Sequence, residues 1–162
     1  MGHSILSKHG DLMSDYIIRK ATLDDIQACV IMSMDFMKET PYSKNELDYK
    51  SLGEVFVKSV RDGLAFVTEE DGDVFGMLIA HKVPAFFNNN IFIAQEIGWW
   101  VDKEYRHTKA AGELIRAFEN EARKDCKYTV MSLLSTSPKE LKQYLNHIGY
   151  TEKEYSYFKE NE

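Results

Sequence analysis

The sequence predicts an α/β fold in which about four helices flank one sheet of about six to seven strands. Short apolar runs of strand length alternate along the chain with longer segments in which apolar residues recur at helical spacing. Glycine, proline and asparagine separate many of these segments, as expected for turns. The chain has 162 residues, 44% hydrophobic and 28% charged, which is enough for one domain with a substantial core.

The first third of the chain predicts one strand followed by two helices. Tyr16–Lys20 has the length and apolar content of a short strand. Thr22–Asp25 has the pattern of a helix N-terminus, and apolar residues then recur at helical spacing until Pro41 ends the helix. After a loop over Thr40–Asn45, we expect a second helix over about Leu47–Arg61, ended by an Asp-Gly pair.

Two strands and a loop are expected next. Leu64–Thr68 and Val74–Lys82 flank a polar turn with a glycine at its tip, so they predict an antiparallel hairpin. Pro84–Asn90 is expected to be a loop because it joins a proline to three consecutive asparagines around two phenylalanines.

The strand Ile91–Val101 is the segment around which the fold is organised. Simple alternation places Trp99 and Val101 on one face of the strand and Ala94 and Trp100 on the other. Because both faces are apolar, the strand is expected to be covered on both sides.

The last third of the chain predicts a helix, a strand, a short helix and a final strand. A polar turn over Asp102–His107 leads to an amphipathic helix from about Thr108. Tyr128–Leu134 has the pattern of a strand, and the Ser-Pro-Lys-Glu sequence from Ser137 starts a short helix. Thr151–Phe158 can form a last strand.

Composition limits the classes of protein that fit. Residues 1–15 are interpreted as an N-terminal arm or expression remnant, and residues 16–162 as a single domain. No apolar run approaches the ~18 residues of a membrane span. The two cysteines, Cys29 and Cys126, are expected to be unpaired, which suits the cytoplasm. The net charge of −6 argues against nucleic acid as a partner and is typical of either a soluble surface or a site for a cationic ligand.

The start of the helix near Thr108 has the features of an anion site. Thr108 can cap the first turn, and Ala110, Ala111 and Gly112 leave its backbone N–H groups uncrowded. Such helix starts bind phosphate through these N–H groups and the helix dipole. The alternative is an ordinary strand-to-helix turn whose small residues only pack.

The segment from Trp99 to Leu114 resembles the acyl-coenzyme A signature of the GNAT superfamily of N-acetyltransferases. That signature is an apolar strand, a turn similar to V-x-P-x-Y-R, and an R/Q-x-x-G-x-G/A sequence that opens a helix. Arg106 stands at the Arg/Gln position and Ala111 at the final Gly/Ala position. Lys109 replaces the first glycine, and Lys103 stands where proline is common. The predicted order of elements over Tyr16–Phe158 also resembles the GNAT fold.

The resemblance implies a mixed, mostly antiparallel sheet that splays between the strand at 91–101 and the strand at 128–134. It implies that the pantetheine arm of acetyl-CoA enters this gap and pairs with backbone groups of Trp100 and Val101, while the acceptor amine approaches from the opposite side. The residues expected to contact the coenzyme are Trp99, Trp100, Val101, Arg106, His107, Thr108, Lys109, Ala110, Ala111 and Gly112.

Glu96 is the candidate general base. It interrupts an apolar strand, where an ionised carboxylate is costly unless it is paired or faces a cavity. Burial would raise its pKa toward values that allow it to deprotonate an ammonium group, and many GNAT enzymes carry a base on this strand. The alternative is a structural partner for a basic side chain or a backbone N–H group.

A proton donor for the departing thiolate is harder to assign. The family often places a tyrosine four residues before the glycine that ends the last helix, and Leu145 occupies that position here. Tyr144 is one residue away, a rotation of ~100° around the helix, and is the candidate we name. The asparagine that the family often has ahead of this helix is also absent.

The acceptor pocket is expected to involve the first helix and the two loops that follow. Candidate wall residues are Phe36, Tyr42, Phe86 and Phe87, although packing alone also explains each of them. His81 and His107 could be bases but are commonly surface or packing residues, and no residue spacing indicates a metal site.

Two functions are therefore considered. The first is an acetyl-CoA-dependent N-acetyltransferase, without a metal, that acts on an unidentified primary amine; many relatives dimerise, so a homodimer is considered. The second is a GNAT-fold binding module with weak or no catalysis that acts through a protein partner, a type that also occurs in bacteriophage genomes. Neither hypothesis involves nucleic acid or a membrane.

Overall fold

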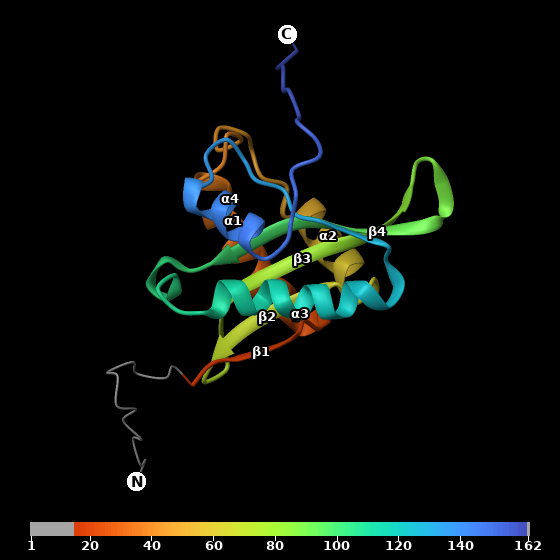
Figure 1. Ribbon diagram of the computed structural model, residues 1–162. Helices are drawn as coiled ribbons and strands as arrows, with labels where there is room; N and C mark the ends of the chain where they lie inside the picture. Colours follow the sequence, from red (N-terminus) through yellow and green to blue (C-terminus); the bar gives the residue numbers. More distant parts are fainter. Residues whose placement is uncertain (1–14, 162) are drawn as a thin grey trace.

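The structure of the protein, a computed structural model, describes residues 15–161 (Figure 1). The arm predicted for residues 1–15 lies outside this range except for Asp15. The elements are β1 (Ile17–Lys20), η1 (Leu23–Asp25), α1 (Ile26–Lys38), α2 (Tyr49–Arg61), β2 (Ala65–Glu70), β3 (Asp73–Ala85), β4 (Asn88–Val101), η2 (Lys103–Tyr105), α3 (Ala110–Asp125), β5 (Tyr128–Val130) and α4 (Lys139–His147).

The sheet has five strands in the order β1-β2-β3-β4-β5. β1 to β4 pair in antiparallel fashion, and β5 runs parallel to β4, so the sheet is mixed and mostly antiparallel as predicted. The prediction of six to seven strands is wrong. Thr151–Phe158 is not a strand; it is exposed and extends away from the sheet (Figure 1). A strand needs a neighbouring backbone to bond, and no described strand lies in register with this segment.

Helices cover both faces of the sheet. Cys29 and Met32 of α1 and Phe56 of α2 form one core with Val67 and Met77 of the sheet. The second core lies on the other face and is built around α3, with Leu145 contributed by α4. Its α3 members are Ala110, Leu114, Ile115, Phe118 and Ala122, which recur at the spacing of a buried helical stripe.

Local capping explains where η1, which leads into α1, and helix α2 begin. The backbone N–H of Thr22 donates to the Asp25 carboxylate at 2.7 Å, which is half of the capping box that the sequence predicts. A carboxylate oxygen of Asp48 accepts from the N–H of Lys50 at 3.0 Å, and α2 therefore begins at Tyr49 instead of Leu47.

The hairpin between β3 and β4 is longer and tighter than predicted. Pairing continues to Ala85 and Asn88, so only Phe86 and Phe87 remain at the turn, and the expected loop over Pro84–Asn90 is mostly strand. In Figure 1 this hairpin projects beyond the rest of the sheet. The alternation of donors and acceptors between two adjacent strands favours such continuation even where side chains are polar.

The sheet opens between β4 and β5. β5 pairs with β4 only from Ile93 to Gln95, whereas β3 remains paired with β4 as far as Val101. Beyond Gln95 the β5 side of β4 therefore has no strand. The predicted strand over Tyr128–Leu134 ends early, at Val130, for the same reason: the N–H of Ser132 donates to the Glu96 carboxylate instead of to a backbone carbonyl.

A bulge in β4 changes which side chains share a face. The register with β3 shifts between Ile79 and Ala80, where Gly98 and Glu96 are the partners and Ile97 is left over. Ala94 and Trp99 consequently both join the core on the α3 face, and Trp100 joins the core on the α1 face. The prediction that Ala94 shares a face with Trp100 is wrong, because simple alternation does not include the extra residue.

Candidate functional site

The open edge of β4 offers backbone hydrogen-bonding groups. The N–H of Asp102 donates to the carbonyl of Phe75 on β3 at 2.8 Å. Antiparallel strands alternate the direction of their backbone groups. The N–H and C=O groups of Trp100 therefore also point toward β3, whereas those of Trp99 and Val101 point toward the opening. This corrects the expectation for Trp100, whose backbone belongs to the sheet. The carbonyl of Val101 accepts from Arg106 Nε at 2.9 Å, which agrees with its outward direction.

The first turn of α3 lies next to this edge. Thr108 Oγ1 accepts from the N–H of Ala110 at 3.2 Å, which is the capping role predicted for it. The N–H groups of Ala111 and Gly112 donate a hydrogen bond to no residue between 15 and 161. The backbone of Lys109 has φ −81°, so the lysine adopts this turn without the positive φ that would require glycine. The turn is therefore a helix start with free donors.

Arg106 points toward α1. Its guanidinium lies 3.3 Å from the carboxylate of Glu39 and 4.4 Å from the centre of the Trp100 ring. Lys103 binds the same carboxylate at 3.1 Å. Arg106 therefore holds the turn between β4 and α3 against the end of α1, and its positive charge is already partnered.

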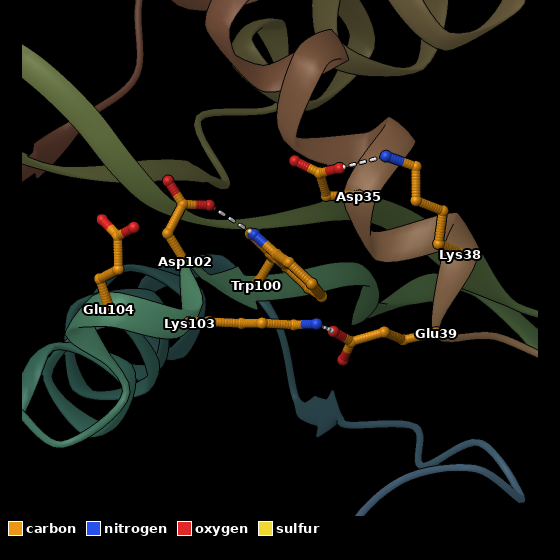
Figure 2. A pocket seen from close by; sticks show the side chains of 7 residues that line it. All are labelled: Asp35, Lys38, Glu39, Trp100, Asp102, Lys103 and Glu104. Atoms are coloured by element: carbon orange, nitrogen blue, oxygen red, sulfur yellow. Dashed lines mark hydrogen bonds and ion pairs between the residues drawn. The ribbon is translucent and has the colours of Figure 1, made fainter.

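A pocket of about 360 Å³ lies between the end of α1 and this turn (Figure 2). The indole of Trp100 stands between the two sides, and its Nε1 donates to Asp102 at 2.8 Å. The lining contains four carboxylates and two lysines, so it is acidic. The residues are Asp35, Lys38, Glu39, Trp100, Asp102, Lys103 and Glu104.

The four aromatic residues considered for the acceptor pocket are not together. Phe36 packs edge-on against Trp100 with 6.1 Å between the ring centres, and Tyr42 packs against Phe158 with 5.4 Å between the ring centres. Phe86 and Phe87 form the hairpin tip, where they are 97% and 57% exposed. Because most of the length of β4 separates this tip from Trp100, the tip lies on the order of 40 Å from the pocket along the strand.

Glu96 is buried where β4 and β5 separate. Its side chain accepts from the N–H of Ser132 at 3.1 Å, and the residue is 8% exposed. Burial raises the pKa of Glu96 to about 7, and the Ser132 hydrogen bond opposes this rise. The carboxyl group therefore exchanges its proton near neutral pH, as a general base must.

Two partly buried tyrosines, Tyr144 and Tyr150, pack against the core on the α3 face of the sheet. Tyr144 lies on the first turn of α3: a Cβ added to Gly112 would be 2.5 Å from its hydroxyl oxygen. The hydroxyl of Tyr150 is buried and has no hydrogen-bond partner among the described residues. Burial, together with the carboxylates of Glu119 and Glu96, raises the pKa of Tyr150. Sequence reasoning did not select Tyr150, although its place directly after the helix-ending Gly149 was a usable signal.

Other candidates do not form a site in the part of the chain that is described. His81 Nε2 lies 3.2 Å from the carbonyl of Val55, and His107 is exposed in the turn. Between residues 15 and 161, no group of His, Cys, Asp and Glu side chains is arranged to hold a metal ion. Over the same residues, no helix combines the length and apolar content needed to cross a bilayer. Burial raises the pKa of the Cys29 thiol to about 12, which makes it unreactive.

Comparison with known proteins identifies the family. The profile of the acetyltransferase (GNAT) family matches residues 30–144, so the chain belongs to this family. No significant match was found among curated protein sequences.

Solved structures agree on the fold. A possible acetyltransferase from Clostridium difficile 630 matches with a TM-score of 0.70 at 18% identity, covering 90% of this chain and 97% of that one. A predicted acetyltransferase from Clostridium acetobutylicum, solved with acetyl-CoA, has a TM-score of 0.70 at 16% identity and covers 90% and 96%. A ribosomal-protein-alanine N-acetyltransferase from Brucella melitensis has a TM-score of 0.69 at 16% identity and covers 91% and 99%.

Proposed function

We propose that the protein transfers the acetyl group of acetyl-CoA directly to a primary amine. The observation that carries this proposal is the combination of an open strand edge, a helix start with free N–H groups and a buried carboxyl group beside them. A thioester with a diphosphate tail has acceptors for both sets of donors, and its reacting carbon would then lie along β4 toward Glu96.

The coenzyme is held by the chain's own backbone in this proposal. The N–H groups of Ala111 and Gly112 bind the diphosphate, and the outward groups of Trp99 and Val101 pair with the pantetheine arm. The other predicted contacts, His107, Thr108, Lys109 and Ala110, shape this turn, while Arg106 and Trp100 brace it against α1.

The chemical step needs a neutral amine next to the thioester carbon. Glu96, or a water molecule that it orders, takes the proton from the ammonium group, and the amine nitrogen then attacks the carbonyl carbon. A backbone N–H on the open edge stabilises the oxygen that becomes negative. Because the pKa of Glu96 is about 7, the carboxylate form is available at physiological pH.

Isothermal titration with acetyl-CoA tests the first half of this proposal. We expect saturable binding that a Gly112→Ala substitution weakens, with Gly53→Ala as the control, since Gly53 lies on α2 with open space where a Cβ would be. Absence of both heat and a thermal shift at millimolar ligand would eliminate the enzyme hypothesis. A panel of amines with detection of the released thiol then identifies the acceptor.

The alternative is a GNAT-fold binding module with weak or no catalysis that acts through a protein partner. Two observations favour it: Leu145 is buried at the position where the family often has a tyrosine, and the charge of Arg106 is partnered by Glu39. Binding of acetyl-CoA without thiol release for any amine would support this alternative.

The proposal extends to the cellular compartment and the oligomeric state of the protein. Two free cysteines, Cys29 and Cys126, fit a reducing compartment such as the cytoplasm. A homodimer remains part of the proposal, and sedimentation at several protein concentrations tests it.

A further inference from the structure

The carboxylate of Glu39 joins the end of α1 to the turn that precedes α3. One of its oxygens lies 3.1 Å from Lys103 Nζ, and the contact spans from the helix to the turn (Figure 2). Its two oxygens also accept from the Arg106 guanidinium, from Nη1 at 3.3 Å and from Nη2 at 3.5 Å. Two cations of the turn therefore share one carboxylate of another element.

Arg106 lies at the opening along which the coenzyme is proposed to run. Its Nε donates to the carbonyl of Val101, which points toward the opening, and its guanidinium carbon lies 4.4 Å from the centre of the Trp100 ring. The N–H groups of Ala111 and Gly112, which are proposed to bind the diphosphate, follow at the start of α3. Arg106 therefore belongs to the segment that holds the phosphate groups, and its Nη1 and Nη2 donors are the ones left for a ligand.

Glu39 occupies the donors that a phosphate group would use. A guanidinium binds a carboxylate or a phosphate with the same pair of N–H groups, so the two acceptors exclude each other at Arg106. Burial raises the pKa of Glu39, but hydrogen bonds from Lys103 and Arg106 outweigh it and hold the pKa below its usual value. The carboxylate is therefore ionised at neutral pH and competes with any anionic ligand for both cations.

We propose that Glu39 is an internal competitor of the coenzyme: it holds Arg106 and Lys103 in the unliganded protein through contacts that phosphate groups of acetyl-CoA replace. This inference rests on the proposed acetyl transfer. It names Glu39, which the sequence analysis did not select, as a residue that sets the affinity for the coenzyme. When the coenzyme binds, the two cations move from the carboxylate to the phosphate oxygens, and no covalent bond changes.

The exposure of these side chains sets the size of the effect. Glu39 and Arg106 are 39% and 41% exposed, and Lys103 is 74% exposed. Ion pairs at this exposure are screened by water, and each changes an equilibrium by roughly 1.5- to 5-fold. Loss of both pairs therefore corresponds to roughly 2- to 25-fold. Such a competitor lowers the affinity for the coenzyme and is still displaced by it.

Titration of the full chain with acetyl-CoA at low salt tests this role. Glu39→Gln removes the charge and keeps the length of the side chain, so we expect it to bind acetyl-CoA roughly 2- to 25-fold more tightly than the wild type. Asp35→Asn is the matched control, because Asp35 lines the same pocket but pairs with Lys38 of its own helix. It removes the same charge and should change the affinity by less than about 1.5-fold. At ~1 M salt, where the screening length is ~3 Å, the affinities of Glu39→Gln and wild type should converge.

The other outcomes separate this inference from the proposed function. Equal or weaker binding by Glu39→Gln would refute the competition and leave the proposed transferase intact. Equal tightening by Glu39→Gln and Asp35→Asn would show that only the net charge of the pocket matters, which also contradicts the inference. A difference that persists at ~1 M salt would indicate a change of shape and would overturn it as well. If neither the wild type nor Glu39→Gln binds acetyl-CoA, the proposed function itself fails. Melting temperatures of the three proteins establish that they are folded.

Discussion

The buried carboxyl of Glu96 predicts a pH dependence of stability that a single substitution removes. The pKa of Glu96 is raised from 4.5 to about 7 in the folded protein. The folded chain therefore holds this proton more tightly than the unfolded chain does, and stability falls as the pH rises through the window between these values. At about 1.4 kcal/mol per pKa unit, the difference of about 2.5 units corresponds to ~3 kcal/mol.

Glu96→Gln is the perturbation that isolates this effect. The amide that replaces the carboxyl group keeps an oxygen that can accept from the N–H of Ser132 but has no proton to lose. We expect the free energy of unfolding of the wild type to fall by ~3 kcal/mol relative to the variant between about pH 4 and about pH 8. Any cost of the buried amide is independent of pH and cancels in the comparison.

Urea denaturation of both proteins across this pH range measures the difference. Glu54→Gln, an exposed position on α2, is the matched control and should run parallel to the wild type. If the difference in the free energy of unfolding between wild type and Glu96→Gln stays constant within ~0.5 kcal/mol, the pKa of Glu96 is that of an ordinary glutamate. The argument for a general base then loses its physical basis.

Three further substitutions follow from the packing. Tyr150→Phe should leave the unliganded protein as stable as the wild type or stabilise it by up to ~1 kcal/mol, because the hydroxyl it removes has no partner; a clear loss in urea denaturation would reveal one. Gly76→Ala should lower the free energy of unfolding by ~1–3 kcal/mol, since the added Cβ would lie 2.6 Å from Thr68 Cγ2 and 3.2 Å from the Trp100 carbonyl oxygen. If the variant is as stable as the wild type, β2 moves aside at little cost. Phe86→Ser, at the 97% exposed hairpin tip, should change the free energy of unfolding by less than ~0.5 kcal/mol, and a larger loss would indicate a contact that forms in solution.

The sequence was sufficient for most of the element order. The helix predicted from about Thr108 and the helix predicted over Leu47–Arg61 are present within two residues, because their apolar stripes and end signals are local. The turn after β4 was predicted for the same reason, since a strand, a polar turn and small residues at a helix start are adjacent in the chain.

Features that depend on a partner strand were not predictable. Thr151–Phe158 has strand-forming residues but no register with a neighbouring strand, and the Pro84–Asn90 segment looks like a loop yet pairs across a two-residue turn. Pairing is a contact between distant segments, and local propensity does not report it.

By itself, the sequence determined that β4 would be apolar on both faces, that Glu96 would interrupt it and that a helix with an uncrowded start would follow. Only the tertiary structure decided which groups meet. The bulge at Ile97 shifts the alternation by one residue, so that Trp99 faces the α3 core and turns its backbone to the opening. A single extra residue reverses every later side chain of a strand, and that reversal depends on pairing with β3, which no local pattern encodes.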